Sequence, residues 1–195
     1  MAIKRFYCLL FVLCVYTPGL FAQHFMHGAG ATISAIVGTV KIPGGSESFG
    51  LSQTNLTYFP RYNFIENENS SISVGAPIGV GLAIVSNTSG DDAGISFAYD
   101  LPVVVDYNMG CKSTKENDKH FGGYVGAGFG YYKISISNSE YSNYNGATYG
   151  PMVRGGVRFK LPKWDSEAVT IGMYYKQGIE SDKLTTIGFN VLYDF

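Results

Sequence analysis

Apolar side chains recur at every second position over most of the chain beyond residue 22. The clearest run spans residues 72–84, where isoleucine, valine, leucine and alanine alternate with serine, glycine, proline and alanine. A repeat of two residues places one kind of side chain on each face of a β-strand. The pattern predicts eight strands, at residues 28–40, 51–65, 72–84, 95–108, 121–132, 149–161, 168–177 and 186–195.

Polar or glycine-rich stretches separate the predicted strands, as turns require. Those after the even-numbered strands are residues 66–69, 111–120 and 161–167, and those after the odd-numbered strands are residues 41–50, 86–94, 138–146 and 178–183. An even number of strands joined by such turns predicts an all-β fold, an eight-stranded antiparallel up-and-down barrel.

The direction in which the apolar face points separates two kinds of barrel. A soluble calycin-like barrel packs this face inward, whereas a transmembrane β-barrel turns it outward. Only 15% of the residues are charged and 25 are glycine, and the polar faces carry mainly small residues. A face in contact with water is expected to be denser in lysine and glutamate. We therefore expect a transmembrane β-barrel, with the soluble ligand-binding barrel as the alternative.

Aromatic residues favour the membrane interpretation, because they gather near strand ends as interfacial girdles do. One end carries Tyr62, Phe64, Tyr107, Phe121, Phe159, Trp164, Tyr193 and Phe195. Nearer the other end or mid-strand lie Tyr58, Phe97, Tyr99, Phe129, Tyr131, Tyr149 and Tyr175.

Residues 1–22 have the layout of a secretory signal peptide. The basic start is Lys4-Arg5, and an apolar core follows at residues 6–15. Pro18-Gly19 then breaks the helix, and Ala22 is the small residue at the cleavage site. The alternative is a membrane anchor, but the apolar core is shorter than the roughly 20 residues that a spanning helix needs. We expect cleavage near Ala22 and a barrel domain at residues 23–195. Cys111 is then the one remaining cysteine, a free thiol.

The last strand ends in the sequence Val191-Leu192-Tyr193-Asp194-Phe195. Together with the signal peptide and the eight alternating strands, it resembles the small outer-membrane β-barrel proteins of Gram-negative bacteria, the OmpA/OmpX-like barrels of the porin-like superfamily. The resemblance covers roughly residues 27–195. It implies that Phe189, Val191, Tyr193 and Phe195 form the signal that the barrel-assembly machinery reads. It implies a fold and a location, but no particular activity.

Charged residues on the inward faces are the most informative polar positions. They are Arg61, Asp100, Asp106, Arg154, Arg158, Lys160, Lys176 and Asp194. One interpretation is a buried network of ion pairs that plugs the lumen, since charges in a narrow interior need partners. The other is a selective pore, which is disfavoured because side chains fill the lumen of an eight-stranded barrel.

Three histidines follow the signal peptide, at positions 24, 27 and 120, and all are expected at the periplasmic end. Outer-membrane lipid A deacylases and palmitoyltransferases use a histidine with a serine near the outer leaflet, and no histidine here is placed for that work. Two histidines in a flexible leader also fall short of a metal site. We expect no catalytic residues, no metal and no cofactor.

These observations predict an integral outer-membrane barrel with a structural or surface-interaction role. A lipid-modifying outer-membrane enzyme is an alternative. The expected partners are outer-membrane lipid, lipopolysaccharide and the assembly machinery, and the barrel is expected to be a monomer. The chain has 14 basic and 15 acidic residues, so no charge excess indicates nucleic acid. Residues 138–146, with Tyr141 and Tyr144, are the candidate contact loop.

Overall fold

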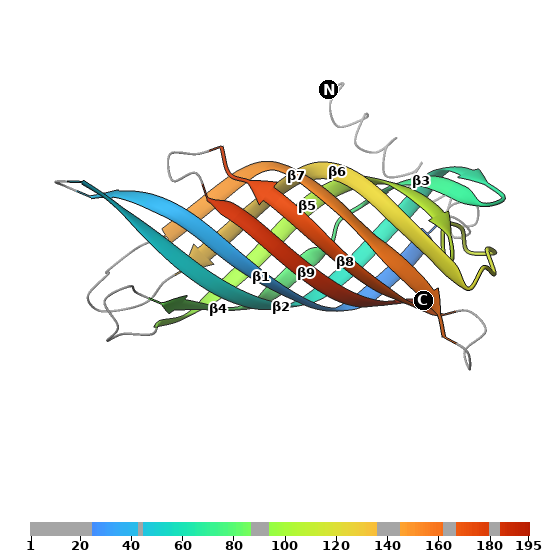
Figure 1. Cartoon of the computed structure of the whole chain (residues 1–195), viewed down its shortest axis with the longest axis horizontal. Coiled ribbons are helices and arrows are strands. Elements are labelled where there is room, and N and C mark those ends of the chain that lie inside the picture. The colour runs from blue at the N-terminus through green and yellow to red at the C-terminus, as the bar shows by residue number, and fades with distance from the viewer. Residues whose placement is uncertain (1–24, 43–44, 87–93, 136–144, 162–166, 180–183) are drawn as a thin grey trace, which may run out of the picture.

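One closed antiparallel sheet dominates the computed structural model of the chain (Figure 1), which describes residues 25–42, 45–86, 94–135, 145–161, 167–179 and 184–195. Within these ranges the strands are β1 (Phe25–Ile42), β2 (Gly45–Asn67), β3 (Ser70–Gly75), β4 (Ile78–Ser86), β5 (Gly94–Gly110), β6 (Phe121–Ser135), β7 (Asn145–Lys160), β8 (Ala168–Gln177) and β9 (Thr185–Asp194). The signal peptide predicted at residues 1–22 lies outside the described residues. In the described ranges, no helix is long and apolar enough to cross a membrane.

The sheet closes into a ring because β1 pairs with β2 on one side and with β9 on the other. Ala31, for example, lies opposite both Leu56 and Val191. β3 and β4 occupy one position in the ring, since both pair with β2 and both pair with β5. The predicted eight-stranded antiparallel up-and-down barrel is therefore confirmed.

Two irregularities were not predicted from the alternation of side chains. The predicted strand at residues 72–84 is broken between β3 and β4, where Pro77 has no N–H for the ladder and the Ala76 N–H donates to the Pro60 carbonyl at 3.0 Å. In β2 the register shifts by one residue between Asn63 and Ile65, so that Phe64 and Ile65 are both exposed. Such a β-bulge turns two consecutive side chains toward the same surface.

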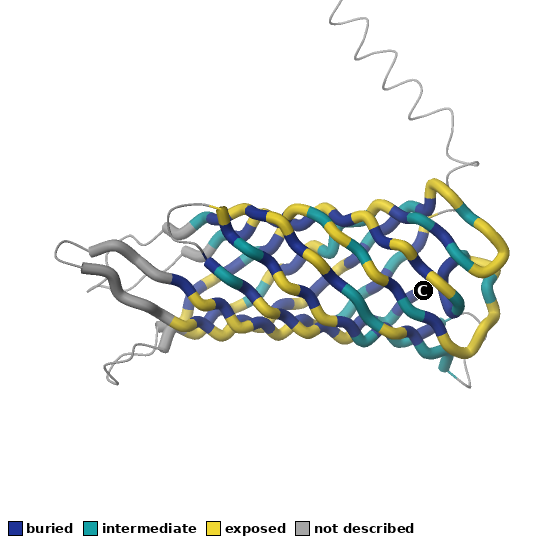
Figure 2. The backbone as a smooth tube through the Cα atoms, turned by 45° about the horizontal axis from the view of Figure 1, so that its top comes forward, coloured by how far each residue is buried: buried dark blue, intermediate teal, exposed yellow. Residues whose placement is uncertain are grey.

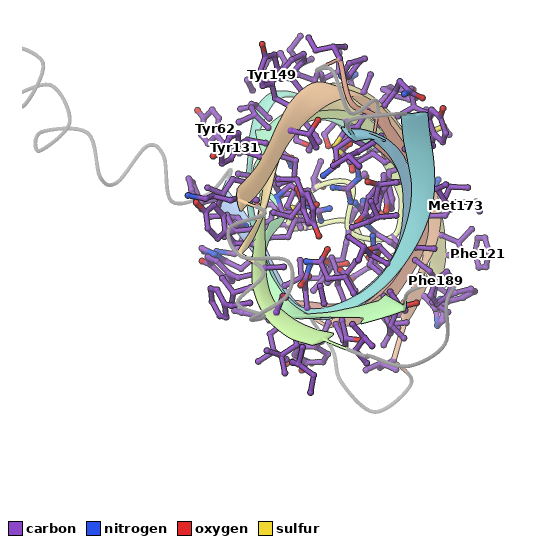
Figure 3. The ribbon with its side chains drawn as sticks, turned by 90° about the vertical axis from the view of Figure 1, so that its left-hand side faces the viewer. Tyr62, Phe121, Tyr131, Tyr149, Met173 and Phe189 are labelled. Atoms are coloured by element: carbon purple, nitrogen blue, oxygen red, sulfur yellow. The ribbon has the colours of Figure 1, made fainter. Side chains whose placement is uncertain are left out.

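The apolar faces of the strands point outward, and the polar faces point into the barrel. Leu56 and Ile95 are 74% and 69% exposed, whereas Arg158 and Lys176 are each 1% exposed. Figure 2 shows this alternation of exposed and buried residues along the strands. Seen along the barrel, side chains such as Tyr131, Met173 and Phe189 point away from the lumen (Figure 3). The soluble alternative is thus wrong, because it requires the apolar face to line the interior.

The two ends of the barrel are different. The first described residues, the C-terminus and the β2–β3 and β5–β6 turns lie at one end, here called the terminal end (Figure 1). The opposite end, here called the loop end, carries the β1–β2, β4–β5, β6–β7 and β8–β9 connections. The predicted turn at residues 41–50 is mostly strand, because β1 continues to Ile42 and β2 begins at Gly45.

Lumen-facing glycines make room for large aromatic side chains. A Cβ on Gly172 would overlap the Tyr124 hydroxyl, and a Cβ on Gly188 would overlap the ring of Tyr174. A Cβ on Gly75 would lie 2.5 Å from the ring of Phe59. The alternation of glycine with apolar residues therefore has a packing role, since each ring occupies the space that a neighbouring side chain would take.

Substitution of Gly172 by alanine is expected to destabilise the folded barrel by about 1–3 kcal/mol, because Tyr124 has to leave its position. The matched control is Gly50→Ala, where nothing lies within 4 Å of the added Cβ and the change should stay within about 0.5 kcal/mol. Urea unfolding in detergent micelles measures both. Equal midpoints for the two variants would contradict the packing role of Gly172.

Candidate functional site: the charged lumen

Seven of the eight charged residues predicted to face the lumen are buried inside the barrel, namely Arg61, Asp100, Asp106, Arg154, Arg158, Lys176 and Asp194. The eighth, Lys160, is not part of this group. It is the last residue of β7, at the terminal end, and its Nζ lies 2.9 Å from Oδ1 of the exposed Asp118. This contact holds the pKa of the Asp118 carboxyl below its usual value. Lys160 thus differs from the other seven residues of the predicted network, since its strand ends at the rim and its side chain is only part-buried.

The loop-end half of the lumen combines apolar side chains with one ion pair. Ile36, Leu51, Ala83, Ala98, Tyr132 and Leu184 form a buried apolar cluster. The Lys176 Nζ donates to Asp100 Oδ1 at 2.8 Å and lies 5.0 Å from the centre of the Tyr132 ring. This apolar layer was not predicted from the sequence, although all its residues but Leu184, which directly precedes β9, stand at inward positions of their strands.

A second apolar cluster lies deeper in the lumen. It consists of Phe59, Val104, Met152, Tyr174 and Leu192. A pocket of about 20 Å³ lies beside it, lined by Asn55, Asp100, Met152, Arg154 and Tyr174 among others. This volume accommodates about one water molecule.

Two further ion pairs occupy the terminal half of the lumen. Arg154 Nε lies 3.7 Å from Asp106 Oδ1, and Arg158 Nε lies 3.7 Å from Asp194 Oδ2. Thr170 links the second pair, because its hydroxyl donates to Asp194 while accepting a hydrogen bond from Arg158 Nε at 3.2 Å. Thr170 and Asp194 come from the neighbouring strands β8 and β9.

The β5–β6 turn folds back into the terminal end of the lumen. Cys111, Lys112 and Ser113 are all buried, and Lys112 has a positive φ of 55°. The Lys112 carbonyl accepts hydrogen bonds from Arg61 at 2.9 Å and Arg158 at 3.4 Å. The Ser113 carbonyl accepts one from the amide nitrogen of Asn63 at 2.9 Å and another from Ser71.

Burial changes the acid–base behaviour of this turn. Desolvation raises the pKa of the Cys111 thiol. Desolvation also lowers the pKa of the Lys112 ammonium, and the charge of Arg61 acts in the same direction. The sequence predicted a polar turn at residues 111–120 with a free thiol. It did not predict that the first three residues of this turn, Cys111 to Ser113, enter the lumen.

His27 was predicted to lie in a flexible leader, but it lies in β1. Its Nδ1 lies 2.6 Å from the Tyr58 hydroxyl, and its ring stacks on those of Tyr58 and Phe195 at 5.9 Å. Tyr58 was expected nearer the other end or mid-strand, and it lies within β2, where it contacts His27 of β1. His120 is exposed in the β5–β6 turn, and His24 lies outside the described residues. Across the described ranges, no three histidine, cysteine, aspartate or glutamate side chains form a group that could hold a metal ion.

The residues of the predicted assembly signal lie along β9, which pairs with β1. Phe189, Val191 and Phe195 are exposed on the outer surface and Tyr193 is half-buried beside Phe195, with ring centroids 6.0 Å apart. The Phe195 N–H donates to the His27 carbonyl at 2.9 Å. Recognition by the assembly machinery stays a prediction, and the candidate contact loop at residues 138–146 falls mostly outside the described residues.

Comparison with solved structures identifies the fold. The outer membrane protein OprG from Pseudomonas aeruginosa is 12% identical over 88% of this chain and 95% of its own length, with a TM-score of 0.52. The fold is that of the small outer-membrane β-barrels. Neisserial surface protein A (11% identity, 88% and 96% coverage, TM-score 0.49) and Ail of Yersinia pestis (15%, 87% and 99%, 0.44) are also similar to this outer-membrane-type barrel. Neither a family model nor a curated protein sequence matches the chain.

Breaking the Lys176–Asp100 pair of this outer-membrane-type barrel is expected to cost about 3–5 kcal/mol of folding free energy, because either single change leaves one buried charge unpaired. Lys176→Met and Asp100→Leu are the single variants. The double variant should lose less stability than either of them, since it leaves no charge behind. Urea unfolding of all four proteins measures the coupling. Strictly additive losses would contradict a direct interaction.

Cys111 in the folded barrel is expected to react slowly with iodoacetamide at pH 8, because its thiol is 1% exposed and its raised pKa keeps it protonated. Unfolding in urea should make it react readily. Mass spectrometry of the peptide that contains Cys111 measures the labelled fraction in each state. Equal rates with and without urea would contradict a buried β5–β6 turn.

Proposed function

We propose that this chain is an integral outer-membrane protein with a closed lumen and a structural or surface-interaction role, carried out without catalysis. The observation that carries the proposal is the distribution of side chains around the ring. Large apolar residues are exposed on every strand, whereas charged and amide side chains are buried inside. An apolar outer surface of this extent would be unfavourable in water and is stabilised by lipid acyl chains.

The contents of the lumen support a closed barrel. Two apolar clusters, three ion pairs and the β5–β6 turn follow one another between the loop end and the terminal end. An eight-stranded barrel has an interior that side chains just fill, so these layers leave no space for a wide aqueous channel.

The fold similarity to OprG and the predicted signal peptide at residues 1–22 support a location in the outer membrane. We further propose that the terminal end faces the periplasm and the loop end faces the cell exterior. Lipid and lipopolysaccharide would then surround the barrel, which would act as a monomer. The assembly machinery would read Phe189, Val191, Tyr193 and Phe195 on β9.

The absence of catalysis is part of this proposal. A lipid-modifying enzyme of the kind considered above needs a histidine and a serine close to the outer leaflet. Both histidines in the described ranges, His27 and His120, lie at the terminal end instead. A mass change of lipid A upon expression of this protein would overturn this part of the proposal.

Leu56→Arg gives a direct test of the membrane location. Leu56 is 74% exposed in the middle of β2, so in a water-soluble protein the change should alter the stability by no more than about 0.5 kcal/mol. In a bilayer the arginine should cost about 2–4 kcal/mol. Refolding into lipid vesicles, followed by urea titration, measures the difference, and Lys119→Arg in the exposed β5–β6 turn is the control. A Leu56→Arg variant whose stability in lipid vesicles equals that of the unchanged protein would contradict the proposed membrane location.

The closed lumen is tested by electrical recording. Purified protein in planar lipid bilayers is expected to give no stable large conductance, because side chains fill the lumen. Folding is verified on gels, where a folded barrel migrates faster unless it is boiled. Steady porin-like current steps from folded protein would overturn the closed lumen.

A further inference from the structure

Cationic groups outnumber carboxylates in the terminal half of the lumen. Arg61, Arg154 and Arg158 are buried there, and the carboxylates beside them are Asp106 and Asp194. Among the described residues, no carboxylate oxygen lies within ion-pair distance of Arg61. Its guanidinium donates instead to the neutral Lys112 carbonyl, and the buried side chain of Lys112 adds an ammonium group that interacts electrostatically with Asp194 and Arg61. A buried cation without a counter-ion is costly unless another group stabilises it.

Two aromatic rings lie between the three guanidinium groups. The carbon at the centre of the Arg154 guanidinium lies 4.5 Å from the centre of the Phe59 ring and 4.6 Å from that of Tyr124. The central guanidinium carbon of Arg61 lies 6.0 Å from the centre of the Phe59 ring, and that of Arg158 lies 4.9 Å from the centre of the Tyr124 ring. The order is therefore arginine, phenylalanine, arginine, tyrosine, arginine. We call these five residues the arginine–aromatic ladder.

The rings contact guanidinium groups whose hydrogen bonding is incomplete. Nε and Nη2 of Arg154 and Nη1 of Arg61 are buried without a hydrogen-bond acceptor, and Asp106 reaches Arg154 Nε only at ion-pair distance, 3.7 Å. All three atoms belong to guanidinium groups that lie beside a ring of the ladder. The face of an aromatic ring is electron-rich and attracts a cation, most strongly where water is excluded.

The barrel wall is shaped to hold both rings. Gly75 leaves room for Phe59, while Gly156 and Gly172 leave room for Tyr124. A Cβ on Gly156 would lie 2.7 Å from the Tyr124 ring. The wall thus fixes each ring between two guanidinium groups.

We propose that Phe59 and Tyr124 hold the three arginines across the lumen as a cationic seal, and that an ion able to pass once the rings are removed is an anion. This rests on the closed lumen of the proposed function. In a narrow interior of low dielectric, an excess of fixed positive charge repels cations and attracts anions.

Neighbouring charges leave the sign of this seal unchanged. The Lys176–Asp100 pair nearer the loop end is neutral overall. At the terminal end, Glu66 accepts a hydrogen bond from Asn63 at 2.7 Å and is only part-buried, so water screens it. The excess of buried cations over buried carboxylates therefore remains.

The test uses the full mature chain with Phe59→Ala and Tyr124→Ala combined, refolded and recorded in planar bilayers under a potassium chloride gradient. Wild-type protein should stay closed. The double variant should conduct, with chloride several-fold more permeant than potassium. Tyr124→Phe keeps the ring face and is the matched control, which should stay closed.

A second variant separates charge from space. Adding Arg61→Gln and Arg154→Gln to the double variant leaves Arg158 and Lys112 against Asp106 and Asp194. It should keep the conductance and lose the preference for chloride. If the double variant does not fold, Tyr124→Ala alone is recorded in the same way, with the same expectation.

The outcomes are distinct. A folded ring-deleted barrel that stays closed, or that conducts potassium as well as or better than chloride, would overturn the seal. Loss of the chloride preference only when the arginines are replaced would support it. A wild-type barrel that already conducts would overturn the closed lumen of the proposed function, and its own ion preference would then test the seal separately.

Discussion

Closure of the sheet between β1 and β9 is the constraint on which the rest of the molecule depends. An open sheet leaves a row of unpaired N–H and C=O groups at each edge, and hydrocarbon supplies no water to bind them. Here β9 pairs with β1 from Thr185 to Asp194, and the Phe195 N–H extends the contact to His27. Because the ring satisfies the backbone, the two faces of each strand can carry opposite kinds of side chain.

Closure also buries the inward side chains, many of which are polar or charged, in the same way as a protein core. The interior is packed in layers, which alternate between apolar clusters and charged groups, and each charged group needs a partner within its own layer. Partners are of three kinds: carboxylates for Arg154, Arg158 and Lys176, a backbone carbonyl of the β5–β6 turn for Arg61, and ring faces, which Arg154 contacts in addition to Asp106. The ladder is thus one of several solutions to the same desolvation problem.

The sequence predicted the strands and their faces well, because a repeat of two residues is local and has to persist across the apolar belt. It predicted the turn at residues 41–50 poorly. There β1 and β2 continue past Val37 and Gly50, where their pairings with β9 and β4 end, and nothing requires the alternation to persist. The break at Pro77 and the bulge after Asn63 are single-residue events inside an otherwise regular pattern.

Which charged side chains pair with one another inside the lumen could not be predicted from the sequence, for a different reason. Alternation places a side chain inside or outside, but the level along the barrel depends on strand tilt and on the stagger between strands. Lys176 meets Asp100 from 76 positions away, and Arg61 meets the Lys112 carbonyl from 51. Lys160 shares a face with Arg158 yet lies at the rim, because two residues advance about 7 Å along a tilted strand, which is about 5 Å along the barrel axis.

The layers of the lumen differ in how strictly their residue types are required. An apolar layer tolerates exchange of one apolar side chain for another, whereas a charged layer requires matched partners. At the loop end, buried apolar side chains such as Ile36 and Leu51 occupy the lumen and need no polar partners. The charges that depend on one another lie deeper, where strands and the β5–β6 turn hold them. Among the described residues, these charge pairs therefore do not depend on the apolar layer at the loop end for their partners. Under the proposed surface-interaction role, the wall and the lumen would hold the exposed connections in place.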